Sequence, residues 1–219
     1  MNWKDSREKK RINMIHANED DKEELTEEET AQVMAALGGE EPPLMGLGSD
    51  LTESAAQQLA MALLQYNGGK IRATADDFEH DTEDVEFYIS SGGGSVNDMF
   101  AVYDLMNIVK IHRDIATFGF GKIYSAAVPL LAAGTKGKRY MGRNARLMMH
   151  HCSAATSGTQ PDIRSTFQEM KRIEDMMVQS IADNSDMSAG EIYNILSKNT
   201  DEFFSAQDAL EMGLVDKII

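Results

Sequence analysis

Two kinds of hydrophobic pattern alternate along the chain from residue 44 onward. Short runs rich in β-branched, aromatic and other apolar residues predict strands, and they occupy residues 85–90, 114–118, 139–141, 145–150 and 215–219. Apolar positions three and four residues apart predict helices, which we place at residues 49–66, 96–109, 125–133 and 162–184, with two shorter ones capped at Ser188 and Ser205. Strands that alternate with helices are typical of the α/β class.

Residues 1–41 differ in composition from the rest of the chain. A short basic start is followed by an acidic run, Glu19 to Glu29, and by a capping pattern that predicts one short helix over residues 31–37. We expect a largely disordered acidic arm, which is a solvated tail, a docking segment or a removable propeptide. The remainder, residues 42–219, is predicted to be one domain, in which the polar and acidic residues 67–84 form a surface loop.

The composition excludes several classes of protein. A formal net charge of −15 disfavours a nucleic-acid binder, which needs cations to neutralise phosphates. No run approaches the ~18 apolar residues that span a bilayer, and the basic start lacks the apolar stretch of a secretory signal. The single cysteine, Cys152, rules out an intrachain disulfide and indicates a reducing compartment. We therefore expect a soluble cytoplasmic protein without nucleic-acid or membrane partners.

Two glycine-rich turns, each between a predicted strand and a predicted helix, carry the candidate chemistry. The first, residues 91–96, has three consecutive glycines whose backbone can approach a ligand closely and offer its N–H groups. A phosphate-binding loop would need a following Lys with Ser or Thr, which is missing, whereas an oxyanion hole needs only fixed N–H donors. The second turn places Ser125 at the start of a helix, where the N–H of Ala126 suits the same oxyanion.

A serine hydroxyl becomes a nucleophile only with a base and an orienting carboxylate. His150 follows Ser125 by 25 residues and Asp201 comes later, an order that differs from those of the common triad folds. Taken singly, these residues are as well explained as a helix cap, a strand histidine and a surface acid. His151 competes as the base, but neighbouring strand side chains face opposite ways, so only one histidine can meet the serine. Cys152 is more readily a small buried residue than a second nucleophile.

Several segments together resemble the ClpP serine peptidases. The resemblance covers about residues 44–219, roughly four fifths of the chain. The matching segments are residues 91–96 (SGGGSV), 103–104, the turn at 125, 130–140 (LLAAGTKGKRY), 144–150 (NARLMMH), 201–206 and 209–216. This resemblance implies an α/β, ClpP/crotonase-like fold of stacked strand–helix units, with the helix at 162–184 as the family's protruding handle helix.

The resemblance implies a role for each candidate residue. Ser125 matches the family's nucleophile, His150 its general base and Asp201 the carboxylate that orients the imidazole. Gly94 and Ala126 match the two backbone donors of the oxyanion hole. The resemblance implies neither a cofactor nor a metal.

The resemblance also implies an endopeptidase that cleaves unfolded polypeptides inside a chamber. Such a chamber is built from heptameric rings stacked through the handle helix and is served by a hexameric AAA+ unfoldase. Three departures from the family bear on this assembly: residues 1–41 lack the usual unfoldase-binding segment, the loop at 67–84 is longer, and Thr200 stands where the family commonly has an arginine that couples stacking to activity. A form without the usual chaperone and a single ring therefore both stay open.

Three alternatives to this function also stay open. A catalytically silent scaffold subunit would be expected to lack a triad residue, and all three are present. An acyl-CoA enzyme of the crotonase type would need an adenine-nucleotide site and no serine nucleophile. A viral head-maturation peptidase would share the chemistry and differ in its substrate.

Overall fold

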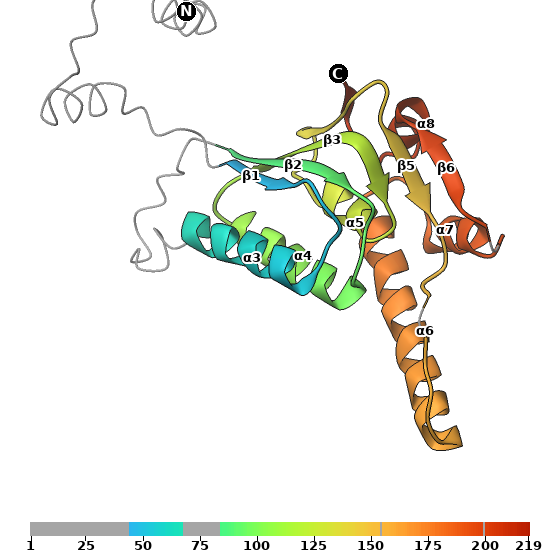
Figure 1. Ribbon diagram of the computed structural model, residues 1–219. Helices are drawn as coiled ribbons and strands as arrows, with labels where there is room; N and C mark the ends of the chain where they lie inside the picture. The colour runs from blue at the N-terminus through green and yellow to red at the C-terminus, as the bar shows by residue number, and fades with distance from the viewer. Residues whose placement is uncertain (1–43, 68–83, 154, 199) are drawn as a thin grey trace, which may run out of the picture. The chain divides into compact units, whose positions relative to one another are not determined.

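The computed structural model describes residues 44–67, 84–153, 155–198 and 200–219. The predicted N-terminal arm, residues 1–41, and almost all of the predicted loop at 67–84 lie outside these residues. The described chain contains seven strands and six helices (Figure 1), which confirms the predicted α/β class. None of the described helices is both long and apolar enough to cross a membrane.

The strands form one sheet that is parallel except at one edge. They are β1 (Leu44–Leu47), β2 (Val85–Ser91), β3 (Ile115–Tyr124), β4 (Arg139–Met141), β5 (Arg146–Met149), β6 (Glu202–Ser205) and β7 (Lys217–Ile218). Their order is β1-β2-β3-β4-β7, while β5 pairs with β3 and β6 pairs with β5. Among the described strands, only β5 and β6 run antiparallel to each other.

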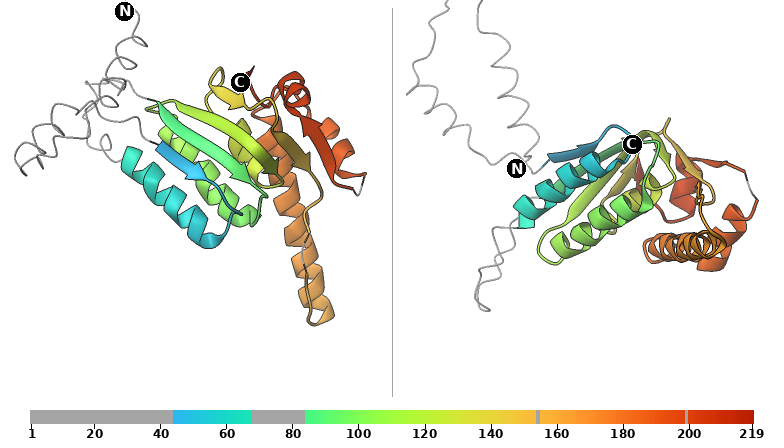
Figure 2. Two further views of the ribbon diagram at one scale, coloured as in Figure 1. Left: turned by 45° about the horizontal axis from the view of Figure 1, so that its top comes forward. Right: turned by 60° about the horizontal axis from the view of Figure 1, so that its bottom comes forward.

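The helices pack against the sheet and, in one case, extend away from it. They are α3 (Glu53–Asn67), α4 (Val96–Val109), α5 (Ala127–Ala132), α6 (Gln160–Ala182), α7 (Ala189–Leu196) and α8 (Ala206–Glu211). α3 and α4 lie side by side on one face of the sheet, whereas α6 points away from it (Figures 1 and 2). The segment after β5 runs alongside α6 to its far end before the helix begins (Figure 1).

β3 is longer than the sequence pattern predicts. The prediction ends a strand at residue 118 and places a turn after it, but β3 continues to Tyr124. Its residues 117–119 pair with β4 and its residues 122–124 pair with β5. Gly121, with a φ of +62°, lets the backbone bend between these two halves without leaving the sheet. The end of β3 therefore lies beside the end of β5.

The hydrophobic pattern does not predict β1 and β6. β1 has no β-branched residue, and β6 directly precedes a capped helix. Both are strands because they pair with a neighbour, β1 with β2 and β6 with β5, and such pairing outweighs local preference.

Helix caps explain where the C-terminal helices begin. The capping boxes expected at Ser188 and Ser205 are present and start α7 and α8. α6 begins at Gln160 rather than at the predicted Asp162, because Asp162 is a first-turn residue whose carboxylate accepts a hydrogen bond from the Thr159 N–H at 2.9 Å.

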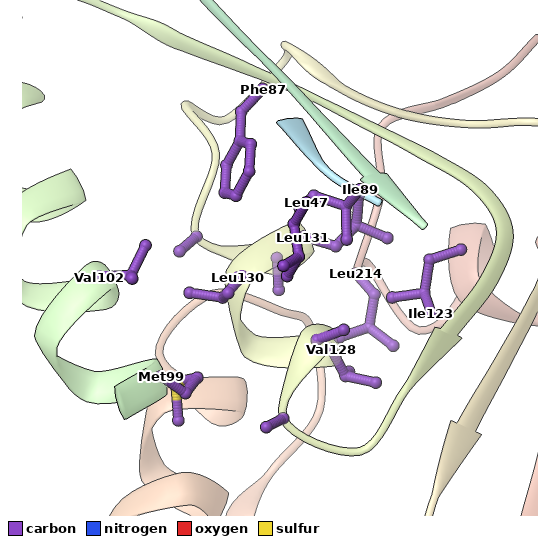
Figure 3. Close-up of a cluster of buried hydrophobic side chains, with 14 of the residues drawn as sticks. Leu47, Phe87, Ile89, Met99, Val102, Ile123, Val128, Leu130, Leu131 and Leu214 are labelled. Atoms are coloured by element: carbon purple, nitrogen blue, oxygen red, sulfur yellow. The ribbon is translucent and has the colours of Figure 1, made fainter. Parts of the chain in front are cut away.

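The hydrophobic core surrounds α5 (Figure 3). All six residues of α5 are buried, and Phe87 of β2, Met99 of α4 and Leu214 near the C-terminus pack around them. Full burial of a leucine or valine side chain stabilises a fold by about 1.5–3 kcal/mol. The core therefore holds α5 firmly, and with it the turn that connects β3 to α5.

Candidate active site

Ser125 occupies that turn, between the last residue of β3 and the first residue of α5. Its φ of 54° is in the left-handed region, and among the described residues it is the only non-glycine with a positive φ. Such a conformation costs on the order of 1–2 kcal/mol for an L-residue and persists only where the surroundings enforce it. Here the Ser125 N–H donates a hydrogen bond to the Met148 carbonyl at 2.8 Å, and the buried α5 holds the other side. The serine is therefore held in a sharp, strained turn.

His150 is brought to Ser125 by the pairing of two parallel strands. Tyr124 of β3 is in register with Met148 of β5, so the residues that follow the two strands lie near each other. The Nε2 atom of His150 is 2.8 Å from the Ser125 Oγ, a hydrogen-bond distance. If Nε2 is unprotonated, it accepts the hydroxyl proton, which is the arrangement that a general base requires.

Asp201 reaches the other side of the same imidazole through the antiparallel edge of the sheet. Met149 is in register with Glu202, and this places Asp201 beside His150. The Asp201 Oδ1 is 3.5 Å from the His150 Nδ1, longer than an ordinary hydrogen bond, and the aspartate side chain is 55% exposed. The three predicted residues are therefore brought together, with the histidine between the serine and the aspartate.

Two other carboxylates near this position are engaged elsewhere. Glu202 accepts hydrogen bonds from Lys198 and Thr200, which hold the pKa of its carboxyl below the usual value. Asp208 caps α8, and hydrogen bonds from Ser205 lower its pKa in the same way. Asp201 is therefore the carboxylate best placed to orient His150.

The triple-glycine turn packs backbone to backbone against the Ser125 turn. A Cβ atom on Gly93 would lie 2.8 Å from the Ser125 Cβ and 3.0 Å from the Ala126 nitrogen, and one on Gly94 would lie 2.2 Å from the Leu51 carbonyl oxygen. Both glycines have positive φ, +88° and +150°. Only residues without a side chain can make this approach.

The N–H groups of Gly94 and Ala126 are the predicted oxyanion donors. The N–H of Gly93, the residue before Gly94, is already used, because it donates to the buried Ser91 hydroxyl at 3.1 Å. Within the described part of the chain, neither the Gly94 nor the Ala126 N–H donates to a protein acceptor. Both groups can therefore donate to a substrate oxygen.

His151 and Cys152 both contact Glu174 of α6. The His151 Nδ1 is 2.9 Å from the Glu174 Oε2, which leaves His150 as the histidine that contacts Ser125. Burial, together with the negative charge of Glu174, raises the pKa of the Cys152 thiol to about 11. A thiol with such a pKa stays protonated and unreactive at neutral pH, which disfavours Cys152 as a second nucleophile.

The sequence alone does not indicate that Glu174 lies near the candidate site. It lies 23 residues beyond His151, in the middle of a helix whose pattern indicates only amphipathicity. No local motif connects the two, so only the folded chain reveals the contact.

Comparison with known proteins finds one matching family and several similar chains. The family model described as Clp protease matches residues 49–219. The ATP-dependent Clp protease proteolytic subunit 2 of Corynebacterium glutamicum is 36% identical over 175 residues, which are 79% of each chain. Subunit 1 of Corynebacterium jeikeium is 36% identical over 173 residues, 79% of this chain and 85% of the relative. Subunit 2 of Bifidobacterium longum is 31% identical over 176 residues, 80% of this chain and 78% of the relative.

Proposed function

The chain belongs to the Clp protease family and is a serine peptidase of that type, and on this premise we propose that Ser125, His150 and Asp201 are its catalytic triad. The N–H groups of Gly94 and Ala126 are proposed as the oxyanion donors. The proposed reaction is hydrolysis of internal peptide bonds in unfolded polypeptides, with no cofactor.

The proposed reaction begins when the Ser125 Oγ attacks the carbonyl carbon of the scissile bond and His150 Nε2 takes the hydroxyl proton. The carbonyl π electrons move onto oxygen, and the N–H groups of Gly94 and Ala126 stabilise this oxyanion, each by about 3–4 kcal/mol. The electrons return, the C–N bond breaks, and the imidazolium gives its proton to the leaving amine. Water deprotonated by His150 then hydrolyses the serine ester by the same steps and restores the hydroxyl.

The observation that carries this proposal is the 2.8 Å contact between Ser125 Oγ and His150 Nε2 at a strained residue. A left-handed backbone is not required for an ordinary surface serine. At a nucleophile, this sharp turn exposes the hydroxyl and leaves the neighbouring N–H free to bind the oxyanion. The same contact disfavours a silent scaffold subunit and an acyl-CoA enzyme. A viral head-maturation peptidase would use the same chemistry, so it remains a variant of the proposed function.

The role proposed for Asp201 is to stabilise the imidazolium and to hold its orientation. Catalytic hydrogen bonds are often long before substrate binds and shorten in the reacting complex. The 3.5 Å separation from His150 Nδ1 suits a carboxylate that closes on the ring as it becomes positively charged.

The apolar side of α6 supports self-association, which we propose gives heptameric rings stacked in pairs. The helix has 23 residues, about 34 Å at 1.5 Å per residue. Near its C-terminus Met177 and Ile181 are buried in the core, but near its N-terminus Ile163 and Phe167 are 44% and 62% exposed. An apolar helix side exposed in this way is typical of a surface that packs against another copy.

A row of aromatic rings on the sheet supports an unfoldase as a further partner. Tyr88, Phe118 and Tyr140 stack in sequence, with ring centroids 4.7 and 4.9 Å apart, and Phe120, 40% exposed, stacks on Tyr88 at 6.2 Å. Such a surface suits an apolar loop of another protein. We propose that it receives a AAA+ unfoldase and that the enzyme works in the cytoplasm.

Labelling with a fluorophosphonate probe tests the proposed function. The probe reacts only with an activated serine, so the wild-type protein should label and Ser125→Ala should not, with circular dichroism and particle size unchanged. Labelling that persists in Ser125→Ala would place the nucleophile at another residue. A folded, assembled wild type that does not label would favour the scaffold subunit.

A further inference from the structure

One carboxylate oxygen of α6 holds the segment directly after the proposed base. The Glu174 Oε2 is 2.9 Å from the His151 Nδ1 and 3.1 Å from the Cys152 backbone nitrogen, whose N–H donates to it. The Glu174 side chain is 17% exposed, against 56% for Glu169 on the same helix. A carboxylate this far removed from water is held there by donors that compensate for its lost solvation.

One side of this contact, Glu174, is firmly placed. Glu174 lies in the half of α6 that packs on the core, just before the buried residues Met177 and Val178. β5, by contrast, ends at Met149, and its pairing with β6 ends there as well. The two residues after His150 therefore have no strand partner. Within the described chain, their hydrogen bonds to another element are those to Glu174, and Cys152 also packs against the core.

We propose that Glu174 is a positioning residue for His150, a role that rests on the proposed function. The backbone around His150 is anchored on both sides. Before it, β5 pairs with β3 and β6, and after it, Glu174 accepts from the His151 side chain and the Cys152 N–H. With both anchors the imidazole stays at 2.8 Å from Ser125 Oγ. Without the second anchor the backbone after His150 loses its hydrogen bonds to α6. A resulting shift of the base by about 1 Å lowers the rate on the order of 100-fold.

The chemistry of the contact defines informative substitutions. Glu174→Leu keeps much of the side chain's bulk and removes the oxygen that makes both contacts. Glu174→Gln keeps an acceptor oxygen of the same reach, so it should hold the segment nearly as well. On the other side, His151→Asn places an amide N–H where the His151 Nδ1 lies, whereas His151→Leu removes that donor. Glu169→Leu is the matched control, because Glu169 is an exposed carboxylate of the same helix that pairs only with Arg172 among the described residues.

The experiment uses three assays on the full-length assembled protein. They are the rate of fluorophosphonate labelling, the steady-state kinetics (kcat and KM) of a short fluorogenic peptide, and amide hydrogen exchange of a peptide covering residues 150–153. We expect Glu174→Leu to lower kcat and the labelling rate about 10- to 100-fold, with KM changed less than about twofold. Exchange in this peptide should become faster. Glu174→Gln, His151→Asn and Glu169→Leu should stay within about threefold of wild type.

The outcomes separate this inference from the proposed function. If the probe modifies the wild-type protein and Glu174→Leu at equal rates, the positioning role is overturned and the proposed function is not. Equal losses in Glu174→Leu and Glu174→Gln also overturn it, because they would indicate a need for charge rather than for an acceptor. If Glu174→Leu fails to fold, the pair His151→Leu and His151→Asn decides, and equal rates in those two overturn the role. A folded wild type that never labels overturns the proposed function, whatever the exchange data show.

Discussion

Gly93→Ala tests whether the contact between the two turns is needed for catalysis. A methyl group at this position would lie 2.6 Å from the Tyr124 carbonyl oxygen, 2.8 Å from the Ser125 Cβ and 3.0 Å from the Ala126 nitrogen. Two of these three neighbours are backbone atoms, which no side-chain rotation can move. The triple-glycine turn and the Ser125 turn must therefore separate if an alanine is to fit.

The expected loss follows from the size of this separation. Carbon atoms in van der Waals contact are about 3.5–4.0 Å apart, so the Cβ at residue 93 falls about 1 Å short of the distance it needs from Ser125. A displacement of about 1 Å at reacting groups costs on the order of 100-fold in rate. Because Gly93 has a φ of +88°, the alanine also adds backbone strain of about 1–2 kcal/mol.

Gly137→Ala separates these two contributions. Gly137 has nearly the same dihedral, +90°, but a Cβ there would meet nothing within 4 Å. Both variants should lower the melting temperature by about 2–8 °C, and only Gly93→Ala should lower kcat/KM for a fluorogenic peptide, by about 100-fold. Wild-type kcat/KM in a folded Gly93→Ala would refute the role of the glycine turn in the site. An equal loss in Gly137→Ala would attribute the effect to strain instead.

Three further predictions address the rest of the proposed mechanism and assembly. Asp201→Asn should lower kcat by about 10²- to 10⁴-fold with little change in KM. A near-normal rate in Asp201→Asn together with an inactive Glu202→Gln would instead assign the orienting role to Glu202. Phe167→Glu should shift sedimentation to smaller particles because it charges the exposed apolar side of α6, whereas Gln168→Glu, an exposed residue beside it, should not. Cys152 should react slowly with iodoacetamide at pH 7.5 and faster as the pH rises toward its pKa of about 11, so rapid alkylation at neutral pH would contradict the protonated thiol.

Local patterns predict most of the fold because they act over a few residues. The span of α4 and the capped starts of α7 and α8 follow from spacing and side-chain chemistry within one or two turns. β6 is different, since its four residues are a strand only because β5 lies next to them. The turn predicted after residue 118 is wrong for a similar reason: β2 pairs with β3 on both sides of Gly121, and β5 pairs with the part after it, so the strand continues to Tyr124.

The site shows the same division between local and long-range information. Ser125 is marked by its glycines and by the helix after it, so its place in a turn can be predicted from the sequence. The approach of Asp201 to His150 depends on the antiparallel register that pairs Met149 with Glu202, and a slip of one residue would turn the side chains to the opposite face. No spacing in the sequence specifies that register, and it is the resemblance to the Clp family that indicates Asp201 as the orienting carboxylate. Neither a local pattern nor the family resemblance indicates Glu174, because its contacts with His151 and Cys152 exist only once α6 has packed on the core. The place of the proposed nucleophile is thus determined locally, whereas the orientation of the proposed base depends on long-range packing. Loss of the Glu174 contacts should therefore affect kcat before it affects substrate binding.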